Sequence, residues 1–180
     1  TLGGTCLNVG CIPSKALLDS SEHYHQLNHT FAEHGISAQK VSLDMAQMIE
    51  RKNQVVSQTC DGVKFLMKKN KIEVHTGVGS FVDKNTIKVT AKDGKETTIT
   101  TEKVIIATGS KPTPLPFAPF DKKRIISSTE ALELKEIPKH LIVIGGGVIG
   151  MELGSVYARI GSKVTVVEYL DSLIPTMDGT

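Results

Sequence analysis

Two cysteines near the start of the chain carry the clearest chemistry. Cys6 and Cys11 lie in the segment TLGGTCLNVGCIPSK, residues 1–15. Thiols at this spacing suit a disulfide that opens and closes. A regular helix would hold two such Cα atoms about 8–9 Å apart, whereas a disulfide needs about 4.4–6.8 Å. A bonded pair therefore predicts a distorted backbone, which Gly10 permits, and a strained bond that is easier to reduce.

The residues after Cys11 predict how the two thiols divide their work. Pro13 suits the first turn of a helix and good helix formers follow it, so we expect a helix from residue 13 to about residue 30. Cys11 would then lie at a helix N-terminus, where backbone N–H groups and the dipole favour a thiolate. Lys15 adds a positive charge one turn further on. This predicts Cys11 as the activated inner thiol and Cys6 as the thiol that meets a substrate.

Other interpretations of these residues remain open on the sequence alone. A structural disulfide would suit a secreted protein, but three cysteines would leave Cys60 unpaired, as an inert and partly buried thiol. A zinc site needs four ligands, and no Cys-x-x-Cys partner accompanies Cys6 and Cys11. His25 and His29 share a helical face without a carboxylate or cysteine nearby in spacing, so we expect a solvated face and no metal site.

The run GGGVIG, residues 145–150, is the second group with recognisable chemistry. It follows an apolar strand-like run at 141–144 and precedes a helical pattern to about residue 160, with Gly161 suited to the C-cap. This strand–glycine–helix context is what a dinucleotide-binding motif requires. The helix N-terminus would face a diphosphate.

Each position of this glycine motif has a separate physical task. Gly145 would make the tight turn, Gly147 would let the backbone approach the pyrophosphate, and Gly150 would let the helix pack closely on the strand. Glu168, at the end of the next expected strand (163–167), would accept hydrogen bonds from ribose hydroxyls and repel a 2′-phosphate, which predicts NAD rather than NADP. Glu152 could simply be a first-turn carboxylate that favours the dipole.

The composition excludes several classes of function. Of the 180 residues, 39% are hydrophobic and 22% charged, and the net charge of +2 argues neither for nucleic acid nor for an anionic membrane surface. No apolar run approaches the roughly 18–20 residues of a membrane span. The chain lacks an initiator Met and begins inside a motif, so we expect a fragment of a longer protein.

The remaining pattern predicts the elements that position these residues. Ser42 should cap a second helix with Asp44 in its first turn, and Gly62 could bend that helix. Its buried stripe should comprise Met45, Met48, Ile49, Val56, Val63 and Leu66.

From residue 72 the apolar period becomes two. This predicts an antiparallel meander, with a turn at Asp93-Gly94 and strands at 72–76, 78–82, 86–92 and 95–101. The apolar run 104–107 predicts a strand of a covered parallel sheet. Residues 111–120 contain four prolines and predict a linker. Ser127 and Glu130 predict the capped start of a short helix that ends before Pro138.

Residues 1–15 resemble the redox segment of the flavin-dependent pyridine nucleotide–disulfide oxidoreductases, and CLNVGCIPSK is most similar to the dihydrolipoyl dehydrogenase branch of that family. The resemblance covers nearly the whole chain in family order. It implies that Cys6 is the interchange thiol and Cys11 the charge-transfer thiol beside the flavin. The implied FAD contacts are Gly4, Thr5, Lys15, Gly79, Thr108, Gly109 and Ser110. The implied NAD contacts are Gly145, Gly146, Gly147, Val148, Ile149, Gly150, Glu152 and Glu168.

The resemblance also implies a fold, an α/β Rossmann-like FAD/NAD(P)-binding architecture with a small antiparallel meander. Residues 1–111 would be a portion of an FAD-binding domain without its first βαβ unit, and residues 112–180 the start of an NAD-binding domain. The family's general base, a His–Glu pair from the partner subunit, would lie beyond residue 180, and His140 is a poor candidate for it.

The implied activity is oxidation of dihydrolipoamide to lipoamide through the Cys6–Cys11 disulfide and FAD, with hydride passed to NAD⁺. The implied partners are a lipoyl domain of a 2-oxoacid dehydrogenase complex and a second subunit, in the cytoplasm or the mitochondrial matrix. The alternatives are another disulfide reductase of the family, similar to glutathione or mercuric reductase, or an inactive truncated binding module. We expect the 180 residues alone to be inactive and to retain FAD weakly.

Overall fold

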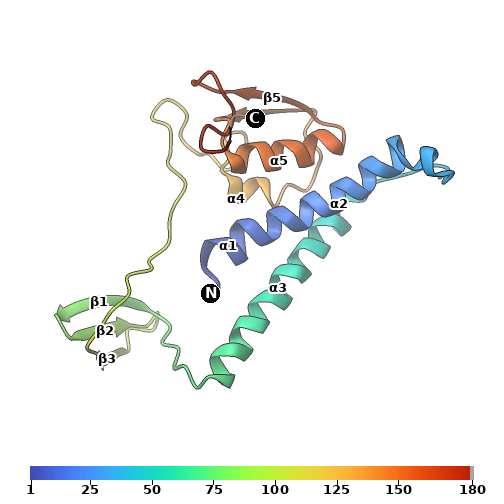
Figure 1. The fold of residues 1–180 in the computed structure, drawn as a ribbon. Helices are drawn as coiled ribbons and strands as arrows, with labels where there is room; N and C mark the ends of the chain where they lie inside the picture. Colours follow the sequence, from blue (N-terminus) through green and yellow to red (C-terminus); the bar gives the residue numbers. More distant parts are fainter. Residues whose placement is uncertain (179–180) are drawn as a thin grey trace. The chain divides into compact units, whose positions relative to one another are not determined.

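The computed structural model describes residues 1–178, which form two compact units (Figure 1). The first unit comprises residues 1–61 and the chain from Lys111 onward; the second comprises residues 62–110. The division falls inside a helix, between Asp61 and Gly62.

Helices dominate the first part of the chain. In order they are α1 (Gly4–Val9), α2 (Cys11–His29), the short 3₁₀ helix η1 (Phe31–His34) and α3 (Met45–Lys69). The helix α2 begins at Cys11, two residues before the expected start at Pro13. The segment before it, expected to be a distorted loop, is a short helix that ends at Gly10.

Asp44, not Ser42, caps the start of α3. Its Oδ1 accepts a hydrogen bond from the N–H of Gln47 at 3.0 Å, and its carbonyl accepts one from Met48. A carboxylate satisfies the free N–H groups of a helix start as well as a hydroxyl does, and Asp44 is the residue adjacent to the first turn. The helix continues through Gly62 to Lys69. Met45 and Met48 are buried as expected, but Leu66 is exposed.

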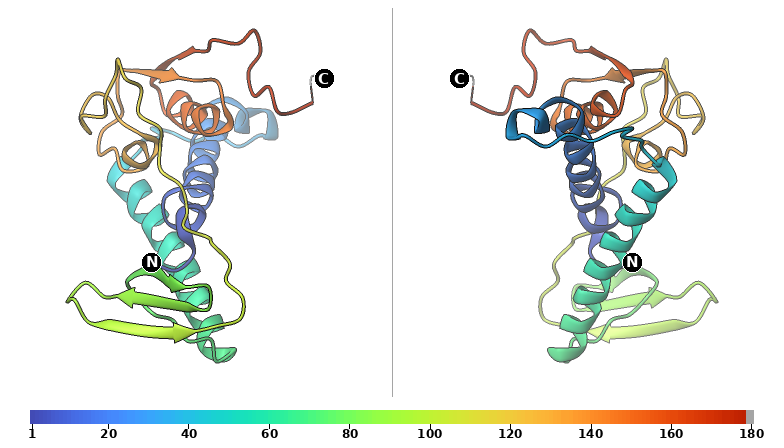
Figure 2. Two further views of the ribbon diagram at one scale, coloured as in Figure 1. Left: turned by 90° about the vertical axis from the view of Figure 1, so that its left-hand side faces the viewer. Right: turned by 90° about the vertical axis from the view of Figure 1, so that its right-hand side faces the viewer.

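A βαβ unit lies at the far end of the chain. The strand β4 (His140–Ile144) pairs in parallel with β5 (Lys163–Val167), from His140 opposite Lys163 to Ile144 opposite Val167. The helix α5 (Val148–Arg159) connects them and packs against α2 (Figure 2). Gly161, at φ +108°, follows the C-cap residue Ile160 and closes the helix.

The core of the first unit is built where α2, α3, α4 (Ser128–Ala131) and α5 meet. Its fully buried side chains include Leu17, Val156 and Tyr157. The start of α4 confirms the expected cap. Ser127 Oγ accepts from the N–H of Thr129, and the Glu130 carboxylate accepts from the N–H of Ser127. This cap fixes the entry of α4 into the core.

The second unit contains the predicted antiparallel meander. Its strands are β1 (Val78–Asp83), β2 (Thr86–Thr90) and β3 (Glu96–Thr100), in the order β1-β2-β3. The hairpin turn forms as expected, with Gly94 at φ +84°. The α/β class with a small meander is therefore confirmed.

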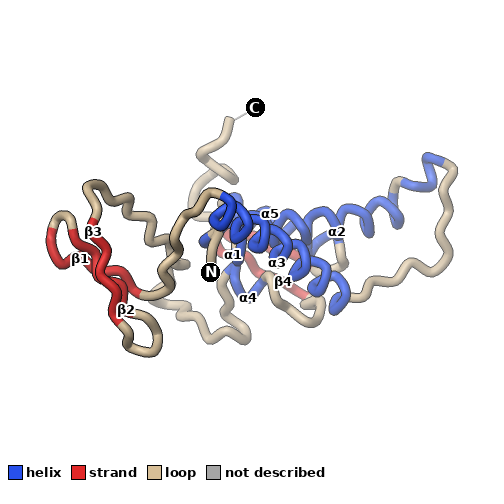
Figure 3. The backbone as a smooth tube through the Cα atoms, turned by 90° about the horizontal axis from the view of Figure 1, so that it is seen from below, coloured by secondary structure: helices blue, strands red, loops and turns tan. Residues whose placement is uncertain are grey.

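Two of the expected strands are absent from the described residues. Residues 72–76 and 104–107 belong to no strand and form no ladder. A strand is stable only when its N–H and C=O groups pair with a neighbour, and in the described part of the chain neither segment has one. Ile105 is accordingly 92% exposed. The whole described stretch from β3 to α4 is loop (Figure 3), as the proline content of residues 111–120 predicts.

Candidate redox and dinucleotide site

The two cysteines form a disulfide at the junction of α1 and α2. Their Cα atoms are 4.7 Å apart, well inside the separation that a regular helix would impose. The helical path is broken at Gly10, whose φ and ψ are −137° and −115°. A Cβ at this position would lie 2.9 Å from the carbonyl oxygen of Thr5. Gly10 is therefore needed for the close approach that brings the two sulfurs together.

Cys11 is the first residue of a 19-residue helix, whereas Cys6 lies in a helix of six residues. The position of Cys11 at a helix N-terminus is as expected. Both cysteine residues are exposed in the structure, so burial does not separate their roles. The two cysteines differ in the helix that carries them. Helix α2, which carries Cys11, is anchored in the core, whereas α1, which carries Cys6, contains no buried residue.

Glu152 of α5 joins the redox segment to the glycine motif. Lys15 Nζ forms an ion pair with Glu152 Oε1, and Ser14 Oγ donates a 2.7 Å hydrogen bond to Oε2. Burial alone would raise the pKa of Glu152, but the bonds from Lys15 and Ser14 and the charge of Lys15 outweigh it and lower that pKa. The carboxylate is therefore ionised at neutral pH and bridges segments 137 residues apart.

A cavity of about 340 Å³ lies beside the disulfide, within the size range of small-molecule sites. One wall is made by the redox segment, including Cys6, Cys11 and Lys15. The opposite wall is made by the first turns of α5, including Val148 and Glu152. The cavity is therefore lined both by the disulfide and by the start of the helix that follows the glycine motif.

The glycine loop has the geometry that its sequence predicts. Gly145 turns the chain at φ +99°, and its N–H donates to the Val167 carbonyl at 2.8 Å. A Cβ on Gly150 would lie 2.8 Å from both the Gly145 carbonyl oxygen and Val143 Cγ1, so only glycine allows this helix–strand contact. A Cβ on Gly147 would meet nothing within 4 Å. The space over Gly147 is the approach that a pyrophosphate would use.

Glu168 lies against this loop. Its Oε2 accepts from the N–H of Gly146 at 2.5 Å, and its Oε1 accepts from the N–H groups of Tyr169 and Leu170 at 2.7 and 2.8 Å. The bonds from Leu170, Gly146 and Tyr169 lower the pKa of Glu168. A negative charge is thus held at the end of β5, where an adenosine ribose would bind in a dinucleotide fold.

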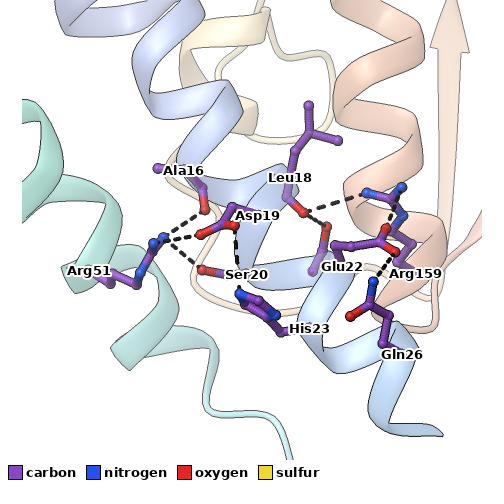
Figure 4. A network of polar contacts seen from close by, with 10 residues as sticks. Ala16, Leu18, Asp19, Ser20, Glu22, His23, Gln26, Arg51 and Arg159 are labelled. Atoms are coloured by element: carbon purple, nitrogen blue, oxygen red, sulfur yellow. Dashed lines mark hydrogen bonds and ion pairs between the residues drawn. The ribbon is translucent and has the colours of Figure 1, made fainter. Parts of the chain in front are cut away.

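A network of polar contacts fixes α2 between its neighbours (Figure 4). On one side, Arg51 of α3 donates to Asp19 at 2.7 Å and to the Ala16 carbonyl at 3.0 Å. On the other side, Arg159 of α5 pairs with Glu22 at 2.7 Å. Because Cys11 and Lys15 belong to α2, these contacts hold the redox segment in a fixed position relative to α5.

The expected site residues are divided between the two units. Gly4, Thr5 and Lys15 share the first unit with the disulfide and with the whole 145–150 loop. The remaining expected FAD contacts belong to the second unit. They are Gly79 in β1 and Thr108, Gly109 and Ser110 in the loop after β3.

Two further contributors were not found by sequence reasoning. Ser14 donates to the same Glu152 carboxylate as Lys15. Asn8 donates to the Leu2 carbonyl oxygen and accepts from Cys60 Sγ. No spacing rule could reveal the Ser14 contact, because its partner is 138 residues away. His25 and His29 stack with ring centroids 4.4 Å apart, and no group of three or more metal-ligating side chains occurs among residues 1–178.

The model of the pyridine nucleotide-disulphide oxidoreductase family matches residues 1–180, the entire chain. The chain belongs to this family. A mitochondrial dihydrolipoyl dehydrogenase of Pisum sativum is 52% identical over 98% of the chain, and a dihydrolipoyl dehydrogenase of Trypanosoma brucei brucei is 52% identical over 98%. A leghemoglobin reductase of Vigna unguiculata is 52% identical over 99%. The chain spans only 34% to 37% of the length of these three relatives.

Two solved structures share this fold. LpdA from Mycobacterium tuberculosis matches with a TM-score of 0.89 at 29% identity, over 98% of this chain and 39% of that one. The HOCl-induced flavoprotein disulfide reductase RclA from Escherichia coli matches with a TM-score of 0.74 at 31% identity, over 98% of this chain and 36% of that one. Within residues 1–178, none of the helices combines the length and apolar character that crossing a bilayer would need.

Proposed function

We propose that the full-length protein carrying this chain is a dihydrolipoyl dehydrogenase, which oxidises dihydrolipoamide to lipoamide and reduces NAD⁺. The observation that carries the proposal is the Cys6–Cys11 disulfide facing the dinucleotide helix across the Lys15–Glu152 pair. The 52% identity to two dihydrolipoyl dehydrogenases supports this choice of substrate within the family.

The cysteines perform the first half of the reaction by thiol–disulfide exchange. A dihydrolipoamide thiolate attacks Cys6 Sγ, the Cys6–Cys11 bond breaks, and Cys11 leaves as a thiolate stabilised at the N-terminus of α2. The second substrate thiol, losing its proton to a base, then attacks the mixed disulfide. Lipoamide leaves, and Cys6 is released as a thiol. Two electrons have moved from the substrate to the cysteine pair.

Two cofactors fit the residues of this chain. The open space over Gly147, the N-terminus of α5 and the carboxylate of Glu168 suit the diphosphate and ribose of NAD. The cavity between the disulfide and α5 suits an isoalloxazine, with Lys15 and Glu152 at its edge. A bound FAD would supply the two-electron redox chemistry that links the reduced cysteines to NAD⁺.

We assign residues 1–111 to the FAD-binding part and residues 112–180 to the start of the NAD-binding part. The expected FAD contacts are Gly4, Thr5, Lys15, Gly79, Thr108, Gly109 and Ser110, and the expected NAD contacts are residues 145–150 with Glu152 and Glu168. Glu168 supports NAD over NADP, because its anionic form would repel a 2′-phosphate.

The same proposal names the partners. The substrate would be carried on a lipoyl domain of a 2-oxoacid dehydrogenase complex, and the full-length protein would be a homodimer whose His–Glu base lies beyond residue 180. The Pisum sativum relative, which is named as mitochondrial, supports a place in the mitochondrial matrix in a eukaryote, and the expected place is otherwise the cytoplasm.

A second candidate is another disulfide reductase of the family, running electrons from a reduced pyridine nucleotide to a substrate disulfide. The likeness to RclA, named as a flavoprotein disulfide reductase, supports this second candidate. A comparison of NADH and NADPH turnover distinguishes the two, because Glu168 predicts poor use of NADPH. A chain that retains the motifs without activity would show neither turnover.

The decisive experiment replaces Cys11 with Ser in the full-length flavoprotein. We expect dihydrolipoamide-dependent NAD⁺ reduction to fall by at least about a thousandfold, since the disulfide can no longer form. Asn28→Ala is the control, because Asn28 only donates to the Tyr24 carbonyl of its own helix. Unchanged turnover in the Cys11→Ser variant would refute the proposal.

A further inference from the structure

The helix that carries Cys6 has little to hold it in place. Helix α1 contains six residues, none of them buried, and its N-cap Gly3 offers no side-chain hydrogen bond. A helix this short is not stable on its own in water. The disulfide ties Cys6 to α2, but that tie is cut in every cycle in which the disulfide is reduced. Other contacts must therefore preserve the conformation of α1.

Asn8 supplies such contacts from inside the disulfide loop. Its Nδ2 donates to the carbonyl oxygen of Leu2 at 3.0 Å and to that of Gly4 at 2.9 Å. Both carbonyls lie at the start of α1, on the N-terminal side of Cys6. The side chain thus closes the segment from residue 2 to residue 8 on itself, and Cys6 lies within the closed segment.

Cys60 connects this segment to a larger element. Its Sγ lies 3.5 Å from Asn8 Oδ1 and 3.8 Å from the Leu2 carbonyl oxygen. A thiol is a weak donor, but Cys60 is only 9% exposed and lies on α3, a helix of 25 residues. The Asn8 amide oxygen and the Leu2 carbonyl therefore both face the same buried thiol, which orients the amide for its other two bonds.

We propose that Asn8, oriented by Cys60, is a positioning residue for the redox disulfide. The pair keeps α1 in the conformation that brings Cys6 within bonding distance of Cys11, and so favours the disulfide over the dithiol. The inference rests on the proposed function only for the role of that disulfide in turnover. No new covalent step is involved: dithiothreitol, used as the probe, gives up two electrons and two protons and is itself oxidised to its cyclic disulfide.

The test measures the thiol–disulfide equilibrium of Cys6 and Cys11 in the full-length flavoprotein. The protein is equilibrated with mixtures of reduced and oxidised dithiothreitol, its thiols are trapped, and mass spectrometry counts them. We expect Asn8→Ala to shift the equilibrium about three- to tenfold toward the dithiol, equivalent to a potential higher by about 14–30 mV. Asn28→Ala, which removes an exposed asparagine that bonds only its own helix, should cause no shift.

A double-mutant cycle separates positioning from a general loss of packing. We expect Cys60→Ala to cause a smaller shift than Asn8→Ala in the same direction, and no additional shift when Asn8 is already Ala. Cys60→Ser keeps a donor and should restore the equilibrium to within about twofold of the unaltered protein. Thr59→Ala, at the neighbouring position of α3, should leave the equilibrium unchanged because Thr59 bonds only the Val55 carbonyl.

Two results would overturn the proposal. One is an equilibrium in Asn8→Ala within twofold of the unaltered protein; the other is a Cys60→Ala effect of the same size with and without Asn8. If Asn8→Ala does not fold, Asn8→Ser and the Cys60 variants decide the question. The readout does not use dihydrolipoamide. If the disulfide can be titrated but the protein does not oxidise dihydrolipoamide, the proposed function is refuted. The measured thiol–disulfide equilibrium would still decide whether Asn8 is a positioning residue.

Discussion

Single residues of the glycine loop are required for different reasons, and Gly150 is the most constrained by its neighbours. Its missing Cβ would overlap the Gly145 carbonyl and Val143. We expect Gly150→Ala to lower the free energy of unfolding by about 1–3 kcal/mol, the usual cost of overpacking. Urea denaturation followed by circular dichroism measures the change.

Gly62→Ala is the matched control for this substitution. Gly62 is also helical, but a Cβ there meets nothing within 4 Å. The change should raise the free energy of unfolding by about 0.5–1 kcal/mol, because alanine loses less backbone entropy in a helix. If Gly150→Ala and Gly62→Ala both raise the free energy of unfolding, a Cβ at position 150 does not overlap its neighbours.

The Glu152 carboxylate gives a pH dependence whose sign is fixed by its lowered pKa. Its contribution to stability is present above the ordinary value of 4.5 and is lost as the pH falls through the lower pKa of the folded state. We therefore expect the stability difference between the unaltered chain and Glu152→Gln to be constant above about pH 4.5. The difference should shrink as the solution becomes more acidic.

Unfolding midpoints in denaturant between neutral and acidic pH check this expectation. Glu50→Gln on the exposed face of α3 is the control, because Glu50 only accepts a bond from Gln54. A difference that grew on acidification would show that Lys15 and Ser14 do not stabilise the ionised form of Glu152.

At the scale of elements, one ion pair joins Lys52 of α3 to Glu133, two residues after the end of α4, and its two side chains differ in burial. Lys52 is 2% exposed, whereas its partner Glu133 is 54% exposed. Removing the carboxylate leaves a buried ammonium without its partner, but removing the lysine leaves a carboxylate that water can solvate. We expect Glu133→Ala to cost about 1–3 kcal/mol of unfolding free energy, and Lys52→Met to cost less.

Thermal and urea unfolding of the two variants measure the asymmetry. Glu133→Gln is an additional control, since it keeps an oxygen that Lys52 can donate to. Equal losses for Glu133→Ala and Lys52→Met would show that burial of Lys52 does not control the energetics of the pair.

The elements themselves were predicted well where the signal is local. The βαβ unit, the three meander strands from residue 78 onward and the cap at Ser127 each follow from turn residues, period and capping chemistry within a few positions. The strands expected at 72–76 and 104–107 did not form, because an apolar run specifies a strand only when a partner is present to pair with it. The start of α3 was misplaced because Ser42 and Asp44 are both good caps, and only the observed bonds select Asp44.

The candidate site was predictable in its parts but not in its assembly. The disulfide, the turn at Gly145 and the packing at Gly150 follow from short motifs. The contacts of Glu152 with Lys15 and Ser14 could not be predicted, because they join residues more than 130 positions apart. The contact of Cys60 with Asn8 was also missed, because these two residues are 52 positions apart and no motif links them.

At the scale of the whole molecule, Tyr157 makes the stability of the core of the first unit depend on pH in the alkaline range. Its hydroxyl donates to the Ala131 carbonyl and its ring is fully buried. Burial, with a smaller effect of the Glu133 charge, raises the pKa of Tyr157 to about 12. The stability that this tyrosine contributes is fully present below pH 10 and is lost as the pH rises through about 12.

We expect Tyr157→Phe to remove this alkaline decline in unfolding free energy, which has a slope of at most about 1.4 kcal/mol per pH unit. Tyr169→Phe is the control, because Tyr169 is 97% exposed and its surroundings change little on unfolding. Urea titrations at several pH values above 9 measure the slope. A decline of the same slope in both variants would show that it does not originate from Tyr157.

The division into two compact units determines what an optical experiment on this chain can observe. The chain has no tryptophan, and its three tyrosines, Tyr24, Tyr157 and Tyr169, all belong to the first unit. Intrinsic fluorescence therefore reports only the unit that holds the disulfide, while melting of residues 62–110 would leave the emission unchanged. A tryptophan introduced on the meander would make that unit visible separately, and the two signals together would show whether the units unfold in one step.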